Sequence, residues 1–423
     1  MSKILDESAG KHVFKPLQGK NILLGISGGI ACFKAAEYVR NLTKEGAGVQ
    51  AILTANATRF VTENTFSALS GQKAMTDMFD PSKCFRIPHI NMARQADLFI
   101  ILPATANIIA KLAHGIADDL LTTLFLSFTR QILIFPSMNP DMYSHPATQA
   151  NIDILRSMGF TVVEPDSGTV VCGDRGKGRL PGWKRVLFHI RKALSRKTLQ
   201  GKKVLVTAGP TREPVDPVRY ISNRSSGKMG YSIAEAASIR GASVQLVSGP
   251  VCLPPPGDTE IDITRVETAS EMARAVFSAA ESADIIIMAA AVSDYTPVQP
   301  LEHKMKKSTD KMTLKLQRTT DILQELGLKK KQGLVLAGFC AESRDLKKHA
   351  IEKLRKKNLD LIIANDVTMP GAGFDVDTNA VLLIDREENV VEIPVMDKRA
   401  VAEHILDMLQ DICSQGPASA ASC

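Results

Sequence analysis

This chain of 423 residues has few aromatic residues and lacks the Cys and His spacings typical of metal sites. Aromatic side chains make up 5% of it and do not alternate with its lysine clusters, so the platform needed to stack nucleic-acid bases is missing. The seven cysteines are dispersed, without CxxC or Cys/His spacing, which argues against a disulfide scaffold or a structural zinc site. A dispersed set of this kind is typical of reduced cytoplasmic thiols.

Long apolar runs are also absent. The longest uncharged stretch, Gly241–Gly257, contains four prolines, whereas a membrane-spanning helix needs about 20 mostly apolar residues. Residues 1–20 are polar and contain four lysines, a pattern unlike that of a secretion signal. We therefore expect a cytoplasmic protein that neither enters nor crosses a membrane.

Positive charge is distributed unevenly. Residues 1–200 hold 24 basic and 15 acidic residues, whereas residues 201–423 hold 28 and 30. Eleven Lys or Arg and no acid lie within 175–203, and 301–357 carries sixteen basic against seven acidic residues. Such clusters can be solvated helical faces, nucleic-acid grooves or sites for small polyanions. The shortage of aromatic residues disfavours nucleic acid, which leaves solvated helical faces and sites for small polyanions as the two explanations.

Two segments begin alike, at Gly19 and at Gly201. Each combines a short apolar run, a loop of small residues and a helical pattern, which is how a doubly wound domain begins. The sequence therefore predicts an α/β fold with two tandem doubly wound parallel-sheet domains. The expected parts are a leader 1–18, a first domain 19–190, a linker 191–200, a second domain 201–415 and a flexible tail 416–423.

Further short apolar runs predict the other strands, several of them without alternation, as in parallel strands covered on both faces. In the first domain these are Val49–Leu53, Leu98–Leu102, Ile132–Phe135 and Thr161–Val163. In the second they are Ser243–Val247, Ile285–Met288, Leu334–Ala337, Leu361–Ala364 and Ala380–Ile384. Helices are expected between them, for example over Ala31–Glu45 and Ser270–Ser282.

Polar residues follow several strands of the first domain. The loop Gly25–Ile30 can direct backbone N–H groups toward a phosphate, although a tight turn made for packing explains it equally well. Ser, Thr or Asn also come directly after three other runs, within 53–58, 102–107 and 135–139. Because these strand ends share one rim of a parallel sheet, they predict a site for a phosphate and a polar heterocycle.

Three residues of the first half are candidates for chemistry. His89 lies among apolar residues, Asn139 follows a strand, and Cys172 begins a glycine-rich loop. A nearby basic residue can lower the pKa of a thiol in such a loop. Each also has a structural explanation, namely a buried histidine, a helix cap and an incidental cysteine in a turn.

The segments IPHI, ATANIIAKLAHGIADDLLTT, PSMNPDM and CGDRGKGR resemble, in this order, the flavin-dependent phosphopantothenoylcysteine decarboxylases over about 19–190. Tyr143 departs from the tryptophan usual in that family. The resemblance implies a flavoprotein-type Rossmann-like domain that binds FMN. It also implies that His89 is the base assisting thiol oxidation, that Asn139 holds the substrate carboxylate and that Cys172 donates a proton. The FMN contacts it implies are Gly25, Ser27, Gly28, Thr54, Pro103, Ala104, Thr105, Asn107, Ser137 and Met138.

The second half has its own cluster of hydroxyl, glycine and basic residues over 207–230. Within it, Ser225–Gly230 does not satisfy the Walker A pattern, because positions 222 and 229 carry Ser and Met. The segment can still cradle phosphate through backbone N–H groups. Lys353 and Lys357, four residues apart, share a helix face that suits paired contacts to a polyanion.

The segments AGPTREPVDPVRYISNRSSGKMG, AAAVSDY, KMKK, AGFCAE and NLDLIIANDV resemble the phosphopantothenate–cysteine ligase domain of the bacterial bifunctional enzymes over about 201–405. Thr320 departs from the family's usual proline. The resemblance implies a Rossmann-like ligase domain in which Lys304 stabilises charge during acyl-cytidylate formation and Asn223 acts on that intermediate. It implies Mg²⁺ held mainly by CTP phosphates, with no protein ligand assigned. The CTP contacts are Ala289, Ala290, Ala291, Asp294, Lys304, Thr320, Asp321, Ile322, Phe339, Lys353 and Lys357.

Together the two resemblances imply a coenzyme A biosynthesis enzyme acting on 4'-phosphopantothenate, cysteine and CTP. They also imply a homo-oligomer with trimeric contacts in the first domain and dimeric contacts in the second, which combine to a dodecamer. Two alternatives remain: a flavin or dinucleotide oxidoreductase with an accessory domain, and a non-enzymatic flavoprotein. The missing GxGxxG fingerprint disfavours the first, and the intact set of candidate catalytic residues disfavours the second.

Overall fold

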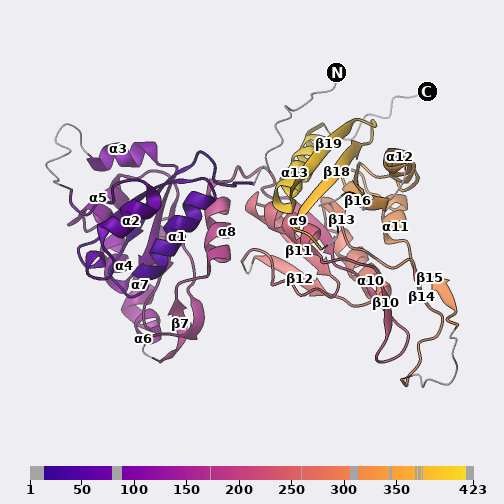
Figure 1. Cartoon of the computed structure of the whole chain (residues 1–423), viewed down its shortest axis with the longest axis horizontal. Helices are drawn as coiled ribbons and strands as arrows, with labels where there is room; N and C mark the ends of the chain where they lie inside the picture. The colour runs from indigo at the N-terminus through magenta and orange to yellow at the C-terminus, as the bar shows by residue number, and fades with distance from the viewer. Residues whose placement is uncertain are drawn as a thin grey trace. The chain divides into compact units, whose positions relative to one another are not determined.

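The computed structural model describes residues 14–78, 88–171, 173–258, 260–304, 313–342, 345–366, 369, 373 and 375–415. The chain divides into two compact units, Lys15–Ser195 and a second unit that starts at Arg196 and also includes Phe14. The catalytic candidate Cys172, most of the predicted leader and the predicted tail lie outside the described residues. Each unit is an α/β sandwich (Figure 1).

The first unit is built on a five-stranded parallel sheet in the order β2-β1-β3-β4-β5. The strands are β1 (Asn21–Ile26), β2 (Gly48–Leu53), β3 (Leu98–Ala104), β4 (Ile132–Pro136) and β5 (Thr161–Val162). A separate hairpin joins β6 (Asp166–Thr169) to β7 (Arg175–Arg179). The helices are α1 (Cys32–Lys44), α2 (Glu63–Ser70), α3 (Pro88–Gln95), α4 (Ala106–Ala113), α5 (Leu120–Ser127), α6 (Pro140–Ser144), α7 (Pro146–Ser157) and α8 (Trp183–Leu194).

The apolar runs of this sheet are unbroken because helices cover both of its faces. Along β1, Ile22 and Leu24 enter one hydrophobic cluster, whereas Leu23 between them enters another. Helices α1, α2 and α8 contribute to the first cluster, and α4, α5 and α7 contribute to the second. Successive side chains of a strand point to opposite faces, so a doubly covered strand needs an apolar residue at each position.

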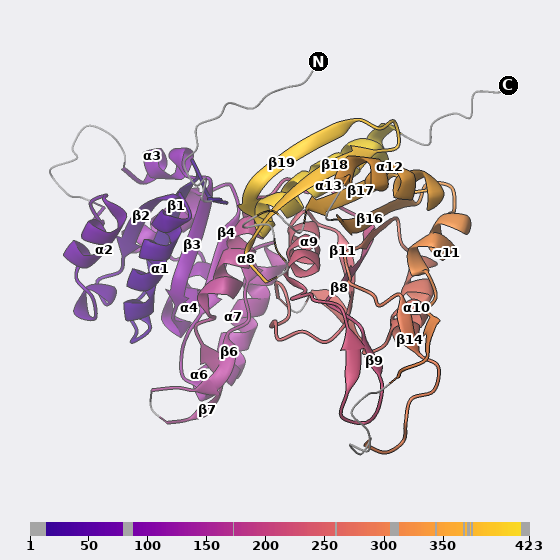
Figure 2. The ribbon, with the colours of Figure 1, turned by 45° about the vertical axis from the view of Figure 1, so that its right-hand side comes forward.

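The second unit contains an eight-stranded sheet in the order β12-β11-β8-β13-β16-β17-β18-β19. Its strands are β8 (Lys203–Ala208), β11 (Ser243–Ser248), β12 (Ile261–Arg265), β13 (Ile285–Met288), β16 (Val335–Glu342), β17 (Leu361–Asp366), β18 (Thr378–Asp385) and β19 (Val390–Asp397). The helices are α9 (Lys228–Ile239), α10 (Ala269–Ala280), α11 (Ile322–Leu328), α12 (Leu346–Lys356) and α13 (Lys398–Gln415). Two small hairpins pair β9 (Arg212–Pro214) with β10 (Tyr220–Ser222), and β14 (Tyr295–Pro297) with β15 (Leu316–Arg318) (Figure 2).

The predicted fold class of two tandem α/β domains with parallel sheets is confirmed, and the last two strands add an antiparallel edge. The strand expected at Ala380–Ile384 lies in β18, which runs antiparallel to β17 and to β19. The segment between Asp366 and Thr378 is shorter than the dozen or so residues that a parallel crossover needs. Strands β12 and β19 were not predicted.

The chain passes from the first unit to the second between Ser195 and Arg196, within the predicted linker 191–200. Helix α8 continues to Leu194, so part of that segment is helical. Leu17, in the predicted leader, is fully buried in the first unit's core. Among the described residues, no helix combines the length and apolar character needed to span a membrane.

Candidate functional site

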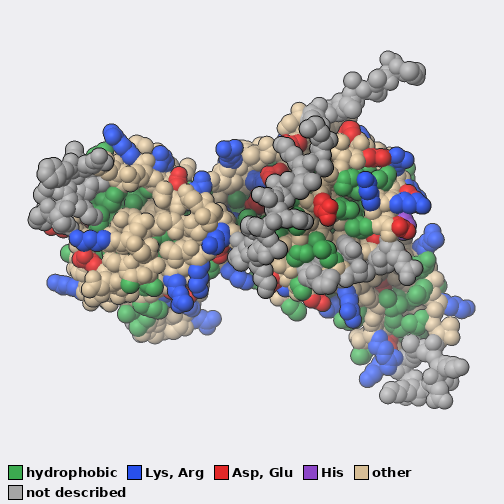
Figure 3. Space-filling model, turned by 45° about the horizontal axis from the view of Figure 1, so that its top comes forward, with side chains coloured by type: hydrophobic (Ala, Val, Ile, Leu, Met, Phe, Trp, Pro, Cys, Tyr) green, Lys and Arg blue, Asp and Glu red, His purple; other side chains and the backbone are tan. Residues whose placement is uncertain are grey.

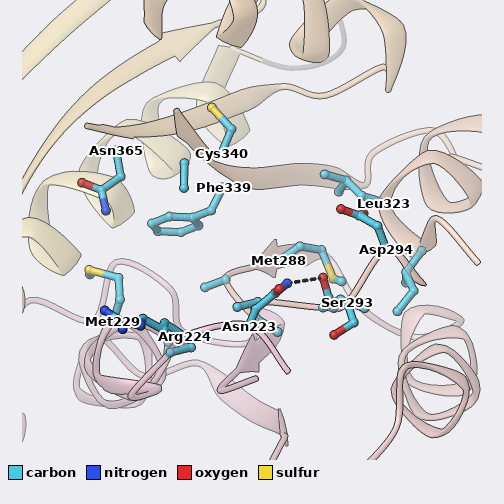
Figure 4. Close-up of a pocket in the computed structure, with 18 of the residues that line it drawn as sticks. Asn223, Arg224, Met229, Met288, Ser293, Asp294, Leu323, Phe339, Cys340 and Asn365 are labelled. Carbon is cyan, nitrogen blue, oxygen red and sulfur yellow. Dashed lines mark hydrogen bonds between the residues drawn. The ribbon is translucent and has the colours of Figure 1, made fainter. Parts of the chain in front are cut away.

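A large cavity of about 940 Å³ lies in the second unit, beside the carboxyl ends of β13 and β16 and the N-terminus of α9 (Figure 4). The strands from β12 to β17 have the chain order 3-2-1-4-5-6, and their order reverses between β8 and β13. In an open doubly wound sheet, ligands bind in the crevice at this reversal. The cavity therefore occupies the position that the topology favours.

The wall formed by α9 depends on a close contact between helix and strand. A Cβ atom at Gly230 would lie 2.6 Å from the Cβ of Ala208 and 2.7 Å from the carbonyl oxygen of Thr207. Gly227, at the N-cap, has a φ of 76°, a conformation that favours glycine. These glycines let α9 begin at the cavity, where its first N–H groups suit an anion.

The opposite wall is the loop after β13, and polar groups fix its backbone. The Thr207 hydroxyl accepts hydrogen bonds from the N–H groups of Ala289 and Ala290, both at 3.1 Å. The Asn223 amide donates to the carbonyl oxygen of Val292 at 3.0 Å (Figure 4). This loop is therefore held in one shape before any ligand arrives.

The structure brings together nearly all of the residues predicted to contact CTP. Those that line the cavity, together with Asn223, are Ala289, Ala290, Ala291, Asp294, Thr320, Asp321, Ile322, Phe339, Lys353 and Lys357. Lys304 is not among the lining residues. It is exposed in the long connection between β14 and β15, directly before residues 305–312, which lie outside the described part of the chain.

The two lysines predicted to share a helix face, Lys353 in α12 and Lys357 directly after it, both have internal partners. The Lys353 ammonium lies 2.6 Å from Oε1 of Glu342, at the end of β16. The Lys357 ammonium lies 2.9 Å from the carboxylate of Asp321, which also caps the N-terminus of α11. An anionic ligand has to compete with these carboxylates for the two lysines.

Several lining residues were missed at the level of sequence. Lys228 and Asn365 lie in segments already noted, but no role was predicted for them, and Lys398 begins α13 far along the chain. The Lys228 ammonium pairs with Oδ1 of Asp377 at 2.7 Å. The Oδ1 atom of Asn365 is buried with no hydrogen-bond partner among the described residues, so it is available as an acceptor for a ligand.

Lys398 is a buried cation on the cavity wall. Its ammonium donates to the carbonyl oxygens of Val376 at 2.6 Å and Gly373 at 3.3 Å. Burial, and after it the charge of the neighbouring Lys228, lower the pKa of Lys398 to about 8, although Asp377 and Asp375 oppose the shift. Lys398 therefore changes charge just above neutral pH.

In the first unit, four strand-end loops converge at a second reversal of strand order, between β1 and β3. Ser27 donates through its hydroxyl to the carbonyl oxygen of Pro103 at 2.8 Å and accepts from the N–H of Thr105 at 2.9 Å. A Cβ atom at Gly28 would lie 2.4 Å from that of Asn56. The loop after β4 is bonded to the end of β3, because the N–H of Ser137 donates to the carbonyl oxygen of Ala104 at 2.9 Å.

The predicted FMN residues lie in these loops or, for Pro103 and Ala104, at the carboxyl end of β3, with two exceptions. Gly25 lies within β1, where a Cβ atom would meet Leu121 of α5, and Asn107 is exposed on the first turn of α4. The hydroxyl groups of Ser27 and Thr105 at this rim suit a phosphate and a polar ring.

His89 lies near the start of α3, and its Nδ1 atom is buried without a partner among the described residues. The donor set therefore fits a flavin nucleotide.

Asn139 is held between α6 and the β6–β7 hairpin. Its Oδ1 atom accepts from the N–H of Asp141 at 2.8 Å and caps α6. Its Nδ2 atom donates to Oδ2 of Asp174 at 2.6 Å. A Cβ atom at Gly178 would lie 2.2 Å from the carbonyl oxygen of Met138, so β7 approaches this loop at a distance only glycine permits.

Tyr143, the departure from the family pattern, is buried beside Asn139. Its hydroxyl donates to Oε2 of Glu164 at 2.8 Å. Burial, together with the carboxylate of Glu164, raises the pKa of Tyr143 to about 12. The hydroxyl is therefore a stable donor at neutral pH and not a candidate base.

Figure 3 shows Lys and Arg scattered among acidic and apolar side chains on the visible face, without one continuous basic stripe. Several Lys and Arg residues in the described part of the chain have acidic partners. Arg185 of α8 pairs with Asp166 at 2.7 Å, and Arg240, the residue that follows α9, pairs with Glu403 at 2.6 Å. Much of the local positive charge is therefore neutralised within the fold.

Two doubly wound units, each with candidate ligand-binding groups at its reversal of strand order, are the arrangement of a two-domain nucleotide- and flavin-dependent enzyme. The flavoprotein family matches residues 12–195, and the DNA/pantothenate metabolism flavoprotein C-terminal domain matches residues 199–412. The coenzyme A biosynthesis bifunctional protein CoaBC of Bacillus subtilis is 46% identical over 402 residues, covering 94% of this chain and 98% of that protein. The protein of the same name from Escherichia coli is 41% identical over 396 residues, covering 92% and 97%.

The chain belongs to this family of bifunctional coenzyme A biosynthesis proteins. Among solved structures, it resembles the C-terminal domain of a CoaBC protein at 40% identity, covering 52% of this chain and 99% of that one with a TM-score of 0.45. It also resembles a PPC decarboxylase mutant complexed with pantothenoylaminoethenethiol at 25% identity, covering 41% and 96% with a TM-score of 0.38. The predicted family is thus confirmed by the sequence relatives.

The charge state of Lys398 leads to a prediction about anion binding. As the pH rises through about 8, Lys398 loses its proton, so the cavity should attract polyanions less strongly. We expect the Kd of inorganic triphosphate, measured by calorimetry, to rise about fivefold to tenfold between pH 7 and 9. Lys398→Met should weaken binding at pH 7 and remove most of this dependence.

The matched control is Lys356→Met, which removes an exposed lysine of α12 that lines the same cavity. It should weaken binding but leave the decline with pH in place, because Lys398 is intact. An unchanged pH profile in Lys398→Met would contradict the assignment.

Proposed function

We propose that the chain joins 4'-phosphopantothenate to cysteine in a CTP-dependent reaction and then decarboxylates the product in an FMN-dependent reaction, giving 4'-phosphopantetheine. The observation that carries the proposal is the single cavity that gathers Asn223 and the predicted CTP residues other than Lys304. These residues come from segments between positions 223 and 357 that meet only in the folded unit. The family membership of both halves supports the same reading.

The ligation needs an activated carboxylate, because a free carboxylate is a poor electrophile at neutral pH. In the proposed first step, the carboxylate of 4'-phosphopantothenate attacks the α-phosphorus of CTP, pyrophosphate leaves and an acyl-cytidylate forms. The N-terminus of α9 and the lysines of the cavity stabilise the phosphate charge. Lys304, by resemblance, adds its charge during this step.

In the second step, the cysteine amine attacks the acyl carbon and CMP leaves. The Asn223 amide, anchored 3.0 Å from the Val292 carbonyl, lies on the cavity wall where an N–H donor can hold the acyl oxygen. Mg²⁺ would be bound through CTP phosphates and water. Among the described residues, no group of three His, Cys, Asp or Glu is arranged to hold a metal ion.

For the decarboxylation, bound FMN would accept two electrons from the substrate thiol, which makes the cysteinyl carbon able to lose CO₂, and would return them after CO₂ has left. His89, with its buried Nδ1 atom, acts as the base that removes a proton during thiol oxidation. The Asn139 amide binds and orients the substrate carboxylate. Cys172, assigned by resemblance, would donate the proton when the electrons held by FMN return to the enethiolate.

We also propose that the chain assembles as a homo-oligomer with trimeric contacts through the first domain and dimeric contacts through the second. The basis is the resemblance of each domain to its family, with the first domain proposed to span 19–190 and the second 201–415.

The test supplies the purified chain with FMN, Mg²⁺, 4'-phosphopantothenate, cysteine and CTP, and follows pyrophosphate and CO₂. We expect the two products in equal amounts, because each ligated molecule is then decarboxylated. Release of pyrophosphate without CO₂ would support only the ligase activity. The decarboxylase activity also requires that CO₂ appears when 4'-phosphopantothenoylcysteine is the only substrate supplied. The absence of both pyrophosphate and CO₂ would overturn the proposal.

Asn139→Asp should abolish the decarboxylation and spare the ligation. The change places a carboxylate against Asp174 and against the substrate carboxylate, so we expect CO₂ release to fall about 100-fold or more. Pyrophosphate release should stay within about twofold of the wild type, since Asn139 lies in the other unit. Asn64→Asp, an exposed change on α2, is the matched control. Loss of both products in a folded variant would contradict separate sites.

Lys304→Gln should have the opposite effect. We expect acyl-cytidylate formation, measured as pyrophosphate release, to fall about 100-fold because a charge that stabilises the transition state is lost. FMN should remain bound, and 4'-phosphopantothenoylcysteine should still release CO₂. Lys315→Gln, an exposed lysine in the same connection, serves as the control. Unchanged ligation would remove Lys304 from its proposed role.

A further inference from the structure

The β6–β7 hairpin places a carboxylate on the amide that is proposed to bind the substrate carboxylate. Oδ2 of Asp174 accepts a hydrogen bond from Nδ2 of Asn139 at 2.6 Å. A short contact between an amide donor and an ionised acceptor is a charge-assisted hydrogen bond, stronger than a neutral one. An acidic side chain of the chain itself therefore already contacts the proposed carboxylate-binding group.

Asp174 is not needed to orient the Asn139 amide. The Oδ1 atom of Asn139 accepts from the N–H of Asp141 at 2.8 Å, which fixes the oxygen end against the start of α6. The nitrogen end then has to face the hairpin. Because the amide is already oriented, what Asp174 adds is negative charge at the nitrogen end.

The position of Asp174 is set by the backbone of the hairpin. The carbonyl oxygen of Asp174 accepts from the N–H of Val170 at 2.9 Å, and the N–H of Gly173 donates to the carbonyl oxygen of Val170 at 2.9 Å. A backbone hydrogen bond of 3.0 Å, from the N–H of Met138 to the carbonyl oxygen of Gly178, holds strand β7 against the loop that contains Asn139. These contacts hold the carboxylate over Asn139.

We propose that Asp174 is a specificity-determining residue of the decarboxylase site, an internal carboxylate that occupies Asn139 in the absence of substrate and is displaced by the substrate carboxylate. This inference rests on the proposed function. Two carboxylates at one amide repel each other, so a carboxylate-bearing ligand has to move Asp174 aside. Once CO₂ has left, the product has no carboxylate and Asp174 returns to Asn139.

The test compares two unreactive ligands that differ only in the carboxylate. In 4'-phosphopantothenoylserine a hydroxyl replaces the thiol, so the ligand carries the carboxylate but is not turned over. The second ligand, 4'-phosphopantothenoylethanolamine, lacks the carboxylate. The Kd of each is measured by calorimetry on the FMN-loaded full chain.

Asp174→Asn keeps the shape of the side chain and removes its charge. We expect it to lower the Kd of the serine ligand about tenfold, the scale of one charge-assisted hydrogen bond. The Kd of the ethanolamine ligand should stay within about twofold. Asp141→Asn, which removes a neighbouring charge but not the acceptor on Nδ2, should change neither value by more than about twofold.

Weaker binding of the serine ligand by Asp174→Asn would show that Asp174 supports Asn139 and would overturn the proposal, as would an unchanged Kd. An equal gain for both ligands would also overturn it, because the effect would not involve the carboxylate. Asp174→Ala provides a second variant, and flavin content reports whether the first unit is folded. A wild-type chain that releases no CO₂ contradicts the proposed function, whereas the Asp174 proposal fails on the Kd ratio in an active chain.

Discussion

Both sites depend on one constraint of doubly wound sheets, the reversal of strand order beside the first strand of each unit. Strand β1 lies between β2 and β3, and β8 lies between β11 and β13. The loops on the two sides of the reversal diverge and leave a crevice. A hydroxyl ties the two sides together in each unit. Ser27 bonds the loop after β3, and Thr207 bonds the loop after β13.

Several groups proposed to bind anions are paired with carboxylates of the chain itself. Lys353 pairs with Glu342, Lys357 with Asp321, and Asn139 with Asp174. A partly buried donor left without a partner would cost free energy, so these contacts stabilise the fold around both sites. They also lower the net affinity for any anion, because a ligand gains only the difference between the old contacts and the new ones.

Much of the fold could be predicted from local patterns. Unbroken apolar runs such as Leu98–Leu102 and Ile285–Met288 identified strands that are covered on both faces, and both appear in the structure. The missed strands have different patterns. Strand β12 alternates buried and exposed residues only weakly, and β19 is an edge strand with mostly exposed side chains. The direction of β18 depends on the length of a connection, which hydrophobicity does not encode.

The sequence by itself determined the two α/β units, the family and the residues at the strand ends, because strand burial and glycine-rich loops leave local signatures. Only the tertiary structure decided which distant groups meet. Lys398 lies some distance along the chain from the rest of the cavity, and Asp174 reaches Asn139 only because β7 packs on the loop after β4. Such contacts arise from packing between elements, and nothing in the spacing of the residues records them.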